Sequence, residues 1–302
     1  VNLTNPASHF EVSKKALEAG KHVYSEKSMA LSLEDANTLY DLAAEKGLRI
    51  ASAPDTYLCG GLQTCRKLVD EGAIGTPCGF TANLTCAGHE LWHPEAGFHL
   101  EKNGGPMLDM GPYYVAGLVS IFGPVKQIFC FCKTPRKVRT VNGEPKDVEA
   151  ITHYTGVMAF ENGATGTITQ TFDAWNSELP CLEIWGTEGS IVAPDPNFFC
   201  GPVKLFSGKG LVEKLSTIDF FVDKLMTVMG PARNEFLTEV PLILPVDESP
   251  NANMRGLGVS EMASAIMKGR KPRLEAEFAR HVVEALTGFA ISGQTGQVYK
   301  MT

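Results

Sequence analysis

Apolar and polar positions along the first 58 residues alternate between the periods of strands and helices. The intervening segments carry apolar residues at the spacing of one helix face, and the helices are expected to end at Gly20 and Gly47. A capping box at Ser8–Glu11 predicts where the first helix begins. Strands joined by such helices must be parallel, so this segment predicts part of an open, doubly wound sheet. The expected strands are residues 1–4, 22–25 and 48–53.

Beyond residue 58 the pattern changes to longer strands and hairpin turns. Alternation between Val157 and Phe172 predicts an antiparallel sheet with one polar face, which a subunit or the first domain would cover. Two helices, at about 254–268 and 274–288, close the chain. The predicted fold class is α/β, with a partial doubly wound parallel sheet (1–58) before an α+β domain (59–302) that has a large, mostly antiparallel open sheet. Hairpin turns are expected at Asn142-Gly143, Glu161-Asn162-Gly163 and Gly186-Thr187-Glu188-Gly189.

Charge and composition narrow the classes of partner. The 302 residues carry 27 basic and 34 acidic side chains, 27 − 34 = −7, with no block of like charge, which argues against a nucleic-acid or anionic-lipid partner. The longest apolar stretch, 115–125, is interrupted and falls short of the roughly 20 residues that span a bilayer, so no membrane segment is expected. The eight cysteines show no CxxC pair, which favours free thiols and a cytoplasmic location.

The ends of the parallel strands are the first candidate site, because ligands of open parallel sheets lie beyond the carboxyl ends of the strands. That rule points to Asn5-Pro6, Ser25-Glu26-Lys27 and Pro54-Asp55-Thr56. A lysine at such an end can hydrogen-bond a substrate hydroxyl and favour its alkoxide. A solvated lysine after a strand has the same sequence pattern, so position alone leaves both interpretations of Lys27 open.

The glycine-rich segment 104–114 holds a second candidate pair. Asp109 and Tyr113 are four residues apart and share a face if the segment is helical. A phenol is a poor base at its ordinary pKa of about 10, but a nearby lysine cation makes it a usable proton acceptor. The alternative is that Tyr113 and Tyr114 are half-buried core residues.

A third candidate is His89-Glu90-Leu91-Trp92-His93, which matches the H-E-x-x-H pattern of zinc metalloproteases. That chemistry needs both imidazoles on one helix face, and Pro94 disfavours helical geometry at His93. A surface loop, or a loop that lines a substrate pocket, is the favoured interpretation, with no metal, and a zinc hydrolase remains a minor alternative. The sequence has no G-x-G-x-x-G and so no cradle for a dinucleotide pyrophosphate.

The order of these motifs resembles the glucose-fructose oxidoreductase and inositol dehydrogenase family, Gfo/Idh/MocA. Glu26-Lys27-Ser28 is similar to the family's Glu-Lys-Pro, and Asp109 with Tyr113 is similar to its D-x-x-x-(H/Y) pattern. Asn5-Pro6 with His9 resembles the family's strand-end segment near the nicotinamide. The closing segments, 255–258 and 269–272, also resemble those of the family.

The resemblance implies an NAD(P)-dependent oxidoreductase that moves a hydride between the nicotinamide of NAD or NADP and a sugar, cyclitol or related polyol. Residues 1–58 would be the C-terminal half of a Rossmann domain, and 59–302 would bind substrate and form a homo-oligomer through the open sheet. Lys27 would bind the reacting oxygen, Asp109 would orient the substrate, and Tyr113 would exchange the proton. The implied cofactor contacts are Asn5, Pro6, His9, Glu26 and Lys27, and the expected pocket residues are His89, Trp92 and His93.

Two departures from the family pattern carry expectations of their own. Ser28 replaces proline, and a cis bond costs about 3 kcal/mol without proline against about 1 kcal/mol with it, which favours a trans bond and a re-aimed Lys27. The family's glycine loop and ribose-binding acid would lie upstream of Val1, so the chain as written is not expected to hold NAD(P) properly. A truncated, non-catalytic sugar-binding or assembly module is therefore the second hypothesis.

Overall fold

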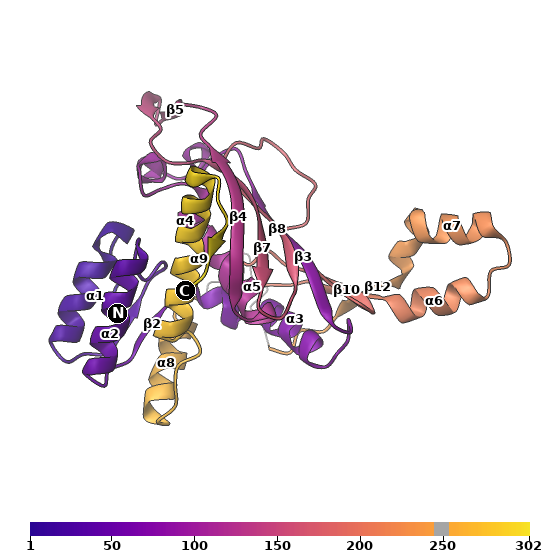
Figure 1. Cartoon of the computed structure of the whole chain (residues 1–302), viewed down its shortest axis with the longest axis horizontal. Coiled ribbons are helices and arrows are strands. Elements are labelled where there is room, and N and C mark those ends of the chain that lie inside the picture. Colours follow the sequence, from indigo (N-terminus) through magenta and orange to yellow (C-terminus); the bar gives the residue numbers. More distant parts are fainter. Residues whose placement is uncertain (245–253) are drawn as a thin grey trace.

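The computed structural model of the protein describes residues 1–244 and 254–302. Strands β1 (Val23–Ser25) and β2 (Ile50–Ser52) pair in parallel, with Val23 opposite Ile50. Helices α1 (His9–Glu18) and α2 (Leu33–Glu45) connect the strands, as Figure 1 shows at the indigo end of the chain. The predicted parallel arrangement is confirmed, although residues 1–4 contribute only one parallel bridge, from Asn2 to Ser25.

The start of the first helix differs from the prediction. Ser8 makes no side-chain cap because its backbone is already helical, at φ −99° and ψ −7°. The cap belongs instead to Asn5, whose side chain accepts from the Ser8 amide at 3.1 Å at the start of the 3₁₀ turn η1 (Pro6–Ser8). The second helix follows the prediction, since the Ser32 hydroxyl accepts from the Asp35 amide at 3.1 Å.

Nine strands form one large sheet within the described residues, in the order β12-β11-β10-β9-β3-β8-β7-β4-β13. Only the β3–β8 pair is parallel, so the prediction of a mostly antiparallel sheet is confirmed. All three predicted hairpin turns join neighbouring strands. The strands are β3 (Pro77–Thr85), β4 (Val125–Lys133), β7 (His153–Phe160), β8 (Thr165–Thr171), β9 (Leu182–Gly186), β10 (Gly189–Ala193), β11 (Val203–Ser207), β12 (Leu237–Val240) and β13 (Tyr299–Lys300), with a separate hairpin of β5 (Val138–Val141) and β6 (Glu144–Asp147).

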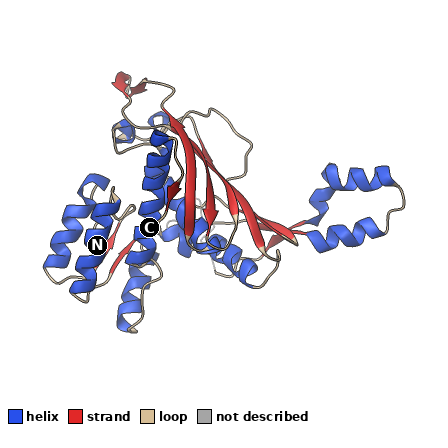
Figure 2. Cartoon of the chain, in the orientation of Figure 1, coloured by secondary structure: helices blue, strands red, loops and turns tan. Residues whose placement is uncertain are grey.

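One face of the large sheet is covered by helices and the other is open (Figures 1 and 2). The core on the covered side includes Phe80, Tyr114 and Phe160, all fully buried. On the open face, Thr165 and Thr167 are exposed, as the alternation predicts. The covering helices are α3 (Gly60–Asp70), α5 (Gly111–Phe122) and α9 (Ala276–Thr295), while α6 (Gly208–Ser216) and α7 (Phe221–Met229) project beyond the β12 edge.

Helix α9 packs against both parts of the chain. Val283 lies in a cluster with Leu17 and Leu39 of the N-terminal helices, whereas Phe289 lies in the core of the large sheet. The helix runs seven residues past its predicted end: Gly288 leaves room for the Tyr299 ring, and the left-handed residue that ends the helix is Gly296, at φ +66°. The domain boundary at residue 58 stays a prediction.

The last element before α9 is α8 (Leu257–Met267), which starts three residues later than predicted. Its N-cap, Gly256, has φ +119°, a conformation that favours glycine. No helix in the described ranges combines the length and apolarity that crossing a bilayer requires.

Candidate active site

Lys27 and Asp109 meet where β1 ends, although 82 residues separate them in sequence. Lys27 Nζ lies 2.7 Å from Asp109 Oδ1 and donates to the Asp109 carbonyl oxygen at 2.6 Å. Burial lowers the pKa of Lys27, but Asp109, Tyr113 and Glu26 together outweigh burial and hold that pKa above its ordinary value. The pKa of Asp109 lies well below its usual range, because Lys27 and His89 outweigh its burial. Both groups are therefore charged near neutral pH.

The backbone at Lys27 differs from the expectation. The Lys27–Ser28 peptide bond is cis, so the predicted trans bond is wrong. The Ser28 carbonyl oxygen lies 2.7 Å from His9 Nδ1, and His9 Nε2 lies 2.9 Å from the Thr4 carbonyl oxygen. Buried His9 thus holds the segment that carries Lys27, and its expected contact with a cofactor stays a prediction.

Tyr113 lies beside this ion pair and beside a second cation. Lys27 Nζ is 5.2 Å from the centroid of the Tyr113 ring, and Arg255 Nη1 is 3.2 Å from the Tyr113 hydroxyl oxygen. The phenol is buried at 4% exposure, and helix α5 carries it one turn beyond the end of α4 (Pro106–Asp109). The two helices are separated by Met110, yet Asp109 and Tyr113 both face Lys27, as their spacing predicts.

Arg255 reaches Tyr113 because a buried carboxylate fixes the turn next to it. Asp55 accepts from the Gly256 amide at 2.5 Å and from the Tyr24 hydroxyl. Asp55 is only 4% exposed and follows β2, at the third strand-end position named from the sequence. The sequence indicated this position but not its partner, because 201 residues separate Asp55 from Gly256.

Two histidines approach the other oxygen of Asp109. His89 Nδ1 lies 3.2 Å and His99 Nδ1 lies 3.5 Å from Asp109 Oδ2. Burial lowers the pKa of His89, but Asp109 and Cys86 together outweigh burial and raise this pKa to about 9. For His99 burial prevails and lowers the pKa to about 4. Sequence reasoning missed His99, which has no motif of its own.

The H-E-x-x-H segment is not an α-helix. Only His89–Leu91 forms a 3₁₀ turn, η3, and Trp92 leaves it with φ −143° and a side chain 68% exposed. Glu90 is bound by buried Arg139, whose Nη1 lies 2.6 Å from Glu90 Oε1. The helical geometry that a zinc-protease motif requires is therefore absent from this described segment, as Pro94 predicts.

A large cleft borders three of the residues predicted to contact cofactor or substrate. It has a volume of about 1120 Å³, and Asn5, Pro6 and His93 line it. Lys27 lies at the next strand end, where Glu26 Oε2 accepts from the Lys27 amide at 3.0 Å. The cleft is large enough for a small-molecule ligand.

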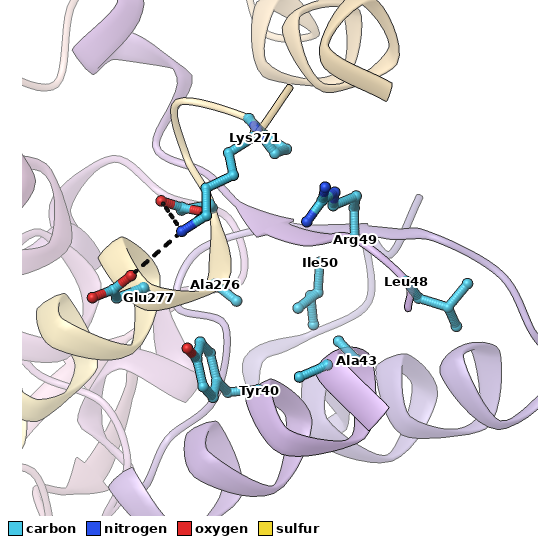
Figure 3. A pocket seen from close by; sticks show the side chains of 11 residues that line it. Tyr40, Ala43, Leu48, Arg49, Ile50, Lys271, Ala276 and Glu277 are labelled. Carbon is cyan, nitrogen blue, oxygen red and sulfur yellow. Dashed lines mark hydrogen bonds and ion pairs between the residues drawn. The ribbon is translucent and has the colours of Figure 1, made fainter. Parts of the chain in front are cut away.

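A smaller pocket of about 120 Å³ lies between α2, β2 and the start of α9 (Figure 3). Its floor is apolar, from residues such as Ala43 and Ile50. Its lysine, Lys271, makes ion pairs with Glu275 at 3.3 Å and Glu277 at 3.8 Å, which the dashed lines in Figure 3 mark. None of the predicted site residues lines this pocket.

Comparison with known proteins identifies the family of the chain. Residues 2–53 match a family model described as "Oxidoreductase family, NAD-binding Rossmann fold". Residues 62–192 match the GFO/IDH/MocA C-terminal domain. The chain belongs to the GFO/IDH/MocA family. The resemblance seen in the motifs and the predicted fold class are both confirmed.

Relatives of the chain include D-xylose dehydrogenase from Paenarthrobacter nicotinovorans, which is 29% identical over 197 residues, covering 60% of this chain and 50% of that protein. An NAD-binding oxidoreductase from Klebsiella pneumoniae shares the fold at a TM-score of 0.78 and 18% identity, over 99% of this chain and 78% of its own. Levoglucosan dehydrogenase in complex with NADH and L-sorbose aligns at a TM-score of 0.77 and 18% identity, with the same coverage. This GFO/IDH/MocA chain spans about half the length of the curated relatives it matches.

Proposed function

We propose that the protein carrying this chain is an NAD(P)-dependent oxidoreductase that transfers a hydride between the nicotinamide and a CH–OH carbon of a sugar, cyclitol or related polyol. The observation that carries the proposal is the charged Lys27–Asp109 pair at a strand end, packed against Tyr113. Relatives named for sugar substrates support the same class of reaction.

Each of the three residues has a distinct role in this proposal. The Lys27 ammonium binds the substrate hydroxyl and stabilises the alkoxide that forms as the proton leaves. Asp109 keeps that ammonium charged and oriented through its 2.7 Å contact. Tyr113 exchanges the proton, and the Lys27 and Arg255 cations beside it stabilise negative charge on its oxygen.

The residues present fit the nicotinamide end of the cofactor. Asn5 and Pro6 line the cleft of about 1120 Å³. Glu26 and Lys27 follow β1 at the next strand end, and the four residues together would hold the ring. A nicotinamide bound in this cleft supplies or accepts the hydride. The proposal concerns this end only, because the sequence contains no G-x-G-x-x-G loop for a pyrophosphate.

Replacement of Lys27 in the intact protein tests the proposal. Formation of reduced nicotinamide cofactor from NAD⁺ or NADP⁺ is measured for the wild type with aldoses, aldonates and cyclitols as substrates. The Lys27→Met variant is expected to show turnover at least about 100-fold lower. Lys21→Met is the matched control, since Lys21 is an exposed lysine just before β1. Unchanged turnover in Lys27→Met would remove Lys27 from the mechanism. An intact protein that binds sugar but neither cofactor would favour the non-catalytic module.

We also infer a homo-oligomer that uses the open sheet face. Three large apolar side chains are exposed there: Phe131 at 69%, Val157 at 48% and Trp185 at 40%. Burying them against a second copy removes apolar area from water. Light scattering should give a multimer for the wild type and a smaller species for Val157→Asp. A monomeric wild type at micromolar concentration would contradict this inference.

A further inference from the structure

Three side chains with metal-ligating atoms converge beside the Lys27–Asp109 pair. His89 comes from η3, His99 from η4 (Ala96–Leu100) and Asp109 from the end of α4. One ligand atom from each lies within 4.8 Å of the other two. Both imidazoles approach the same oxygen, Asp109 Oδ2, because Asp109 Oδ1 is paired with the Lys27 ammonium.

The spacing of these atoms is close to that of ligands around one metal ion. Donor atoms of a tetrahedral Zn²⁺ site, at bond lengths of about 2.0–2.2 Å, lie roughly 3.4 Å from each other. The two histidine nitrogens lie 3.2 and 3.5 Å from Asp109 Oδ2. The centroids of the two imidazole rings lie 4.8 Å apart, and one ligand atom of each residue lies within 4.8 Å of the others.

The polar atoms of this cluster are poorly satisfied by the described protein. Among the described residues, both ring nitrogens of His99 are buried without a hydrogen-bond partner, and Nδ1 of His89 faces Asp109 Oδ2 at 3.2 Å. His99 is 4% exposed and His89 7% exposed. Leaving such a nitrogen unpaired costs about 1–3 kcal/mol, which favours a bound ligand that accepts the lone pair of the neutral His99 imidazole.

Aromatic rings pack around both imidazoles. Phe172 lies with its centroid 4.4 Å from that of His89 and 6.2 Å from that of His99, and Phe98 lies 3.9 Å from His99. Asp109 Oδ1 accepts from Lys27 Nζ at 2.7 Å, which leaves Asp109 Oδ2 facing the two imidazoles. This preorganisation is what a metal site needs from its surroundings.

We propose that His89, His99 and Asp109 form a binding site for a divalent transition-metal ion of the zinc class, with three protein ligands and an open coordination position. Two imidazoles and one carboxylate favour Zn²⁺, Co²⁺ or Fe²⁺ over Mg²⁺ and Ca²⁺, which prefer oxygen ligands. The site differs from the H-E-x-x-H reading of the sequence, because His93 is not among its ligands. Metal binding here does not depend on the proposed oxidoreductase activity.

Titration of chelator-treated intact protein with Co²⁺, followed by its visible absorption, tests the site. We expect the wild type to bind one Co²⁺ per chain and Zn²⁺ to displace it. Binding of Co²⁺ should be at least about 100-fold weaker in His99→Ala. The same loss is expected in His99→Gln, which keeps more of the side-chain volume. His93→Ala is the matched control and should bind like the wild type. Its ring packs against that of His99, with centroids 5.5 Å apart, but lies outside the ligand group.

Removal of the neighbouring cation gives a second readout that a purely structural histidine cluster would not produce. Lys27→Met removes a positive charge 2.7 Å from the Asp109 carboxylate, so Co²⁺ should bind more tightly than in the wild type. Folding of each variant is checked by circular dichroism. The proposal is overturned if folded wild-type protein binds no Co²⁺, if His99 variants bind normally, or if only His93→Ala loses the ion. Because the readout is absorption and not turnover, a failed metal site and a failed oxidoreductase are told apart.

Discussion

Arg139 offers a sharp test of how the loop that carries His89 is held. Its guanidinium is 1% exposed and makes ion pairs with Glu90 at 2.6 Å and with Asp173 at 2.7 Å. It also donates to the carbonyl oxygens of Ala87, at 3.1 Å, and Phe172, at 2.7 Å. The perturbation is Arg139→Met, which keeps much of the apolar stem and removes the charge.

The structure sets the size of the expected loss in the free energy of unfolding. Removing one partner of a buried ion pair costs about 3–5 kcal/mol, because the other charge stays buried without compensation. Asp173 keeps Arg136 Nε at 3.0 Å and the Thr152 hydroxyl at 2.6 Å, so Glu90, at 5% exposure, is the carboxylate left alone. We therefore expect the lower end, about 3 kcal/mol, or roughly a 150-fold change in the unfolding equilibrium constant.

Urea denaturation of the wild type and variants measures this loss. The matched control is Lys146→Met. Lys146 lies in the same β5–β6 hairpin as Arg139, and the substitution breaks its ion pair with Glu101. The Lys146 side chain is 35% exposed and that of Glu101 61% exposed. Surface ion pairs of this kind contribute about 0–1 kcal/mol to the free energy of unfolding. Adding Glu90→Gln to Arg139→Met should recover part of the lost stability, because no charge is then stranded. Equal losses in Arg139→Met and Lys146→Met would refute the reasoning.

Two further predictions concern stability. Burial lowers the pKa of His281, whose neutral imidazole accepts a hydrogen bond from the Val125 amide at 2.9 Å. The stability that His281 contributes to the folded state is therefore complete above pH 6.5. It is lost below that pH, because the unfolded chain takes up a proton there and the folded chain does not. Between pH 7 and 5, the melting temperature should therefore fall less steeply for His281→Gln than for the wild type. Identical slopes of melting temperature against pH would contradict this. Gly258→Ala should lower the unfolding free energy by about 1–3 kcal/mol, because a Cβ there meets the Tyr24 hydroxyl and Asp55, whereas exposed Ser260→Ala on the same helix should change it little. A melt of Gly258→Ala that matches the wild type would show that the clash relaxes.

Features encoded by neighbouring residues could be predicted from the sequence. The period of apolar residues located the crossover helices, and glycine-containing turns located all three hairpins, because both signals act over a few residues. The strand-end rule indicated Lys27, and the spacing of four residues indicated Asp109 and Tyr113, and the structure brings the three side chains together. Local rules failed where packing decided the outcome, as at Gly288, which makes room for Tyr299 inside a helix instead of ending it.

The sequence by itself therefore determined the succession of strands and helices, the turn positions and the residues with suitable chemistry. Only the tertiary structure decided which of them meet. Lys27 and Asp109 are 82 residues apart, Tyr113 and Arg255 are 142 apart, and no short-range pattern links either pair. His99 has no motif, yet the fold places it beside His89 and Asp109. The physical reason is that propensities and turn chemistry act over a few residues, whereas the distances between charged groups, and so their pKa values, are set by how distant segments pack.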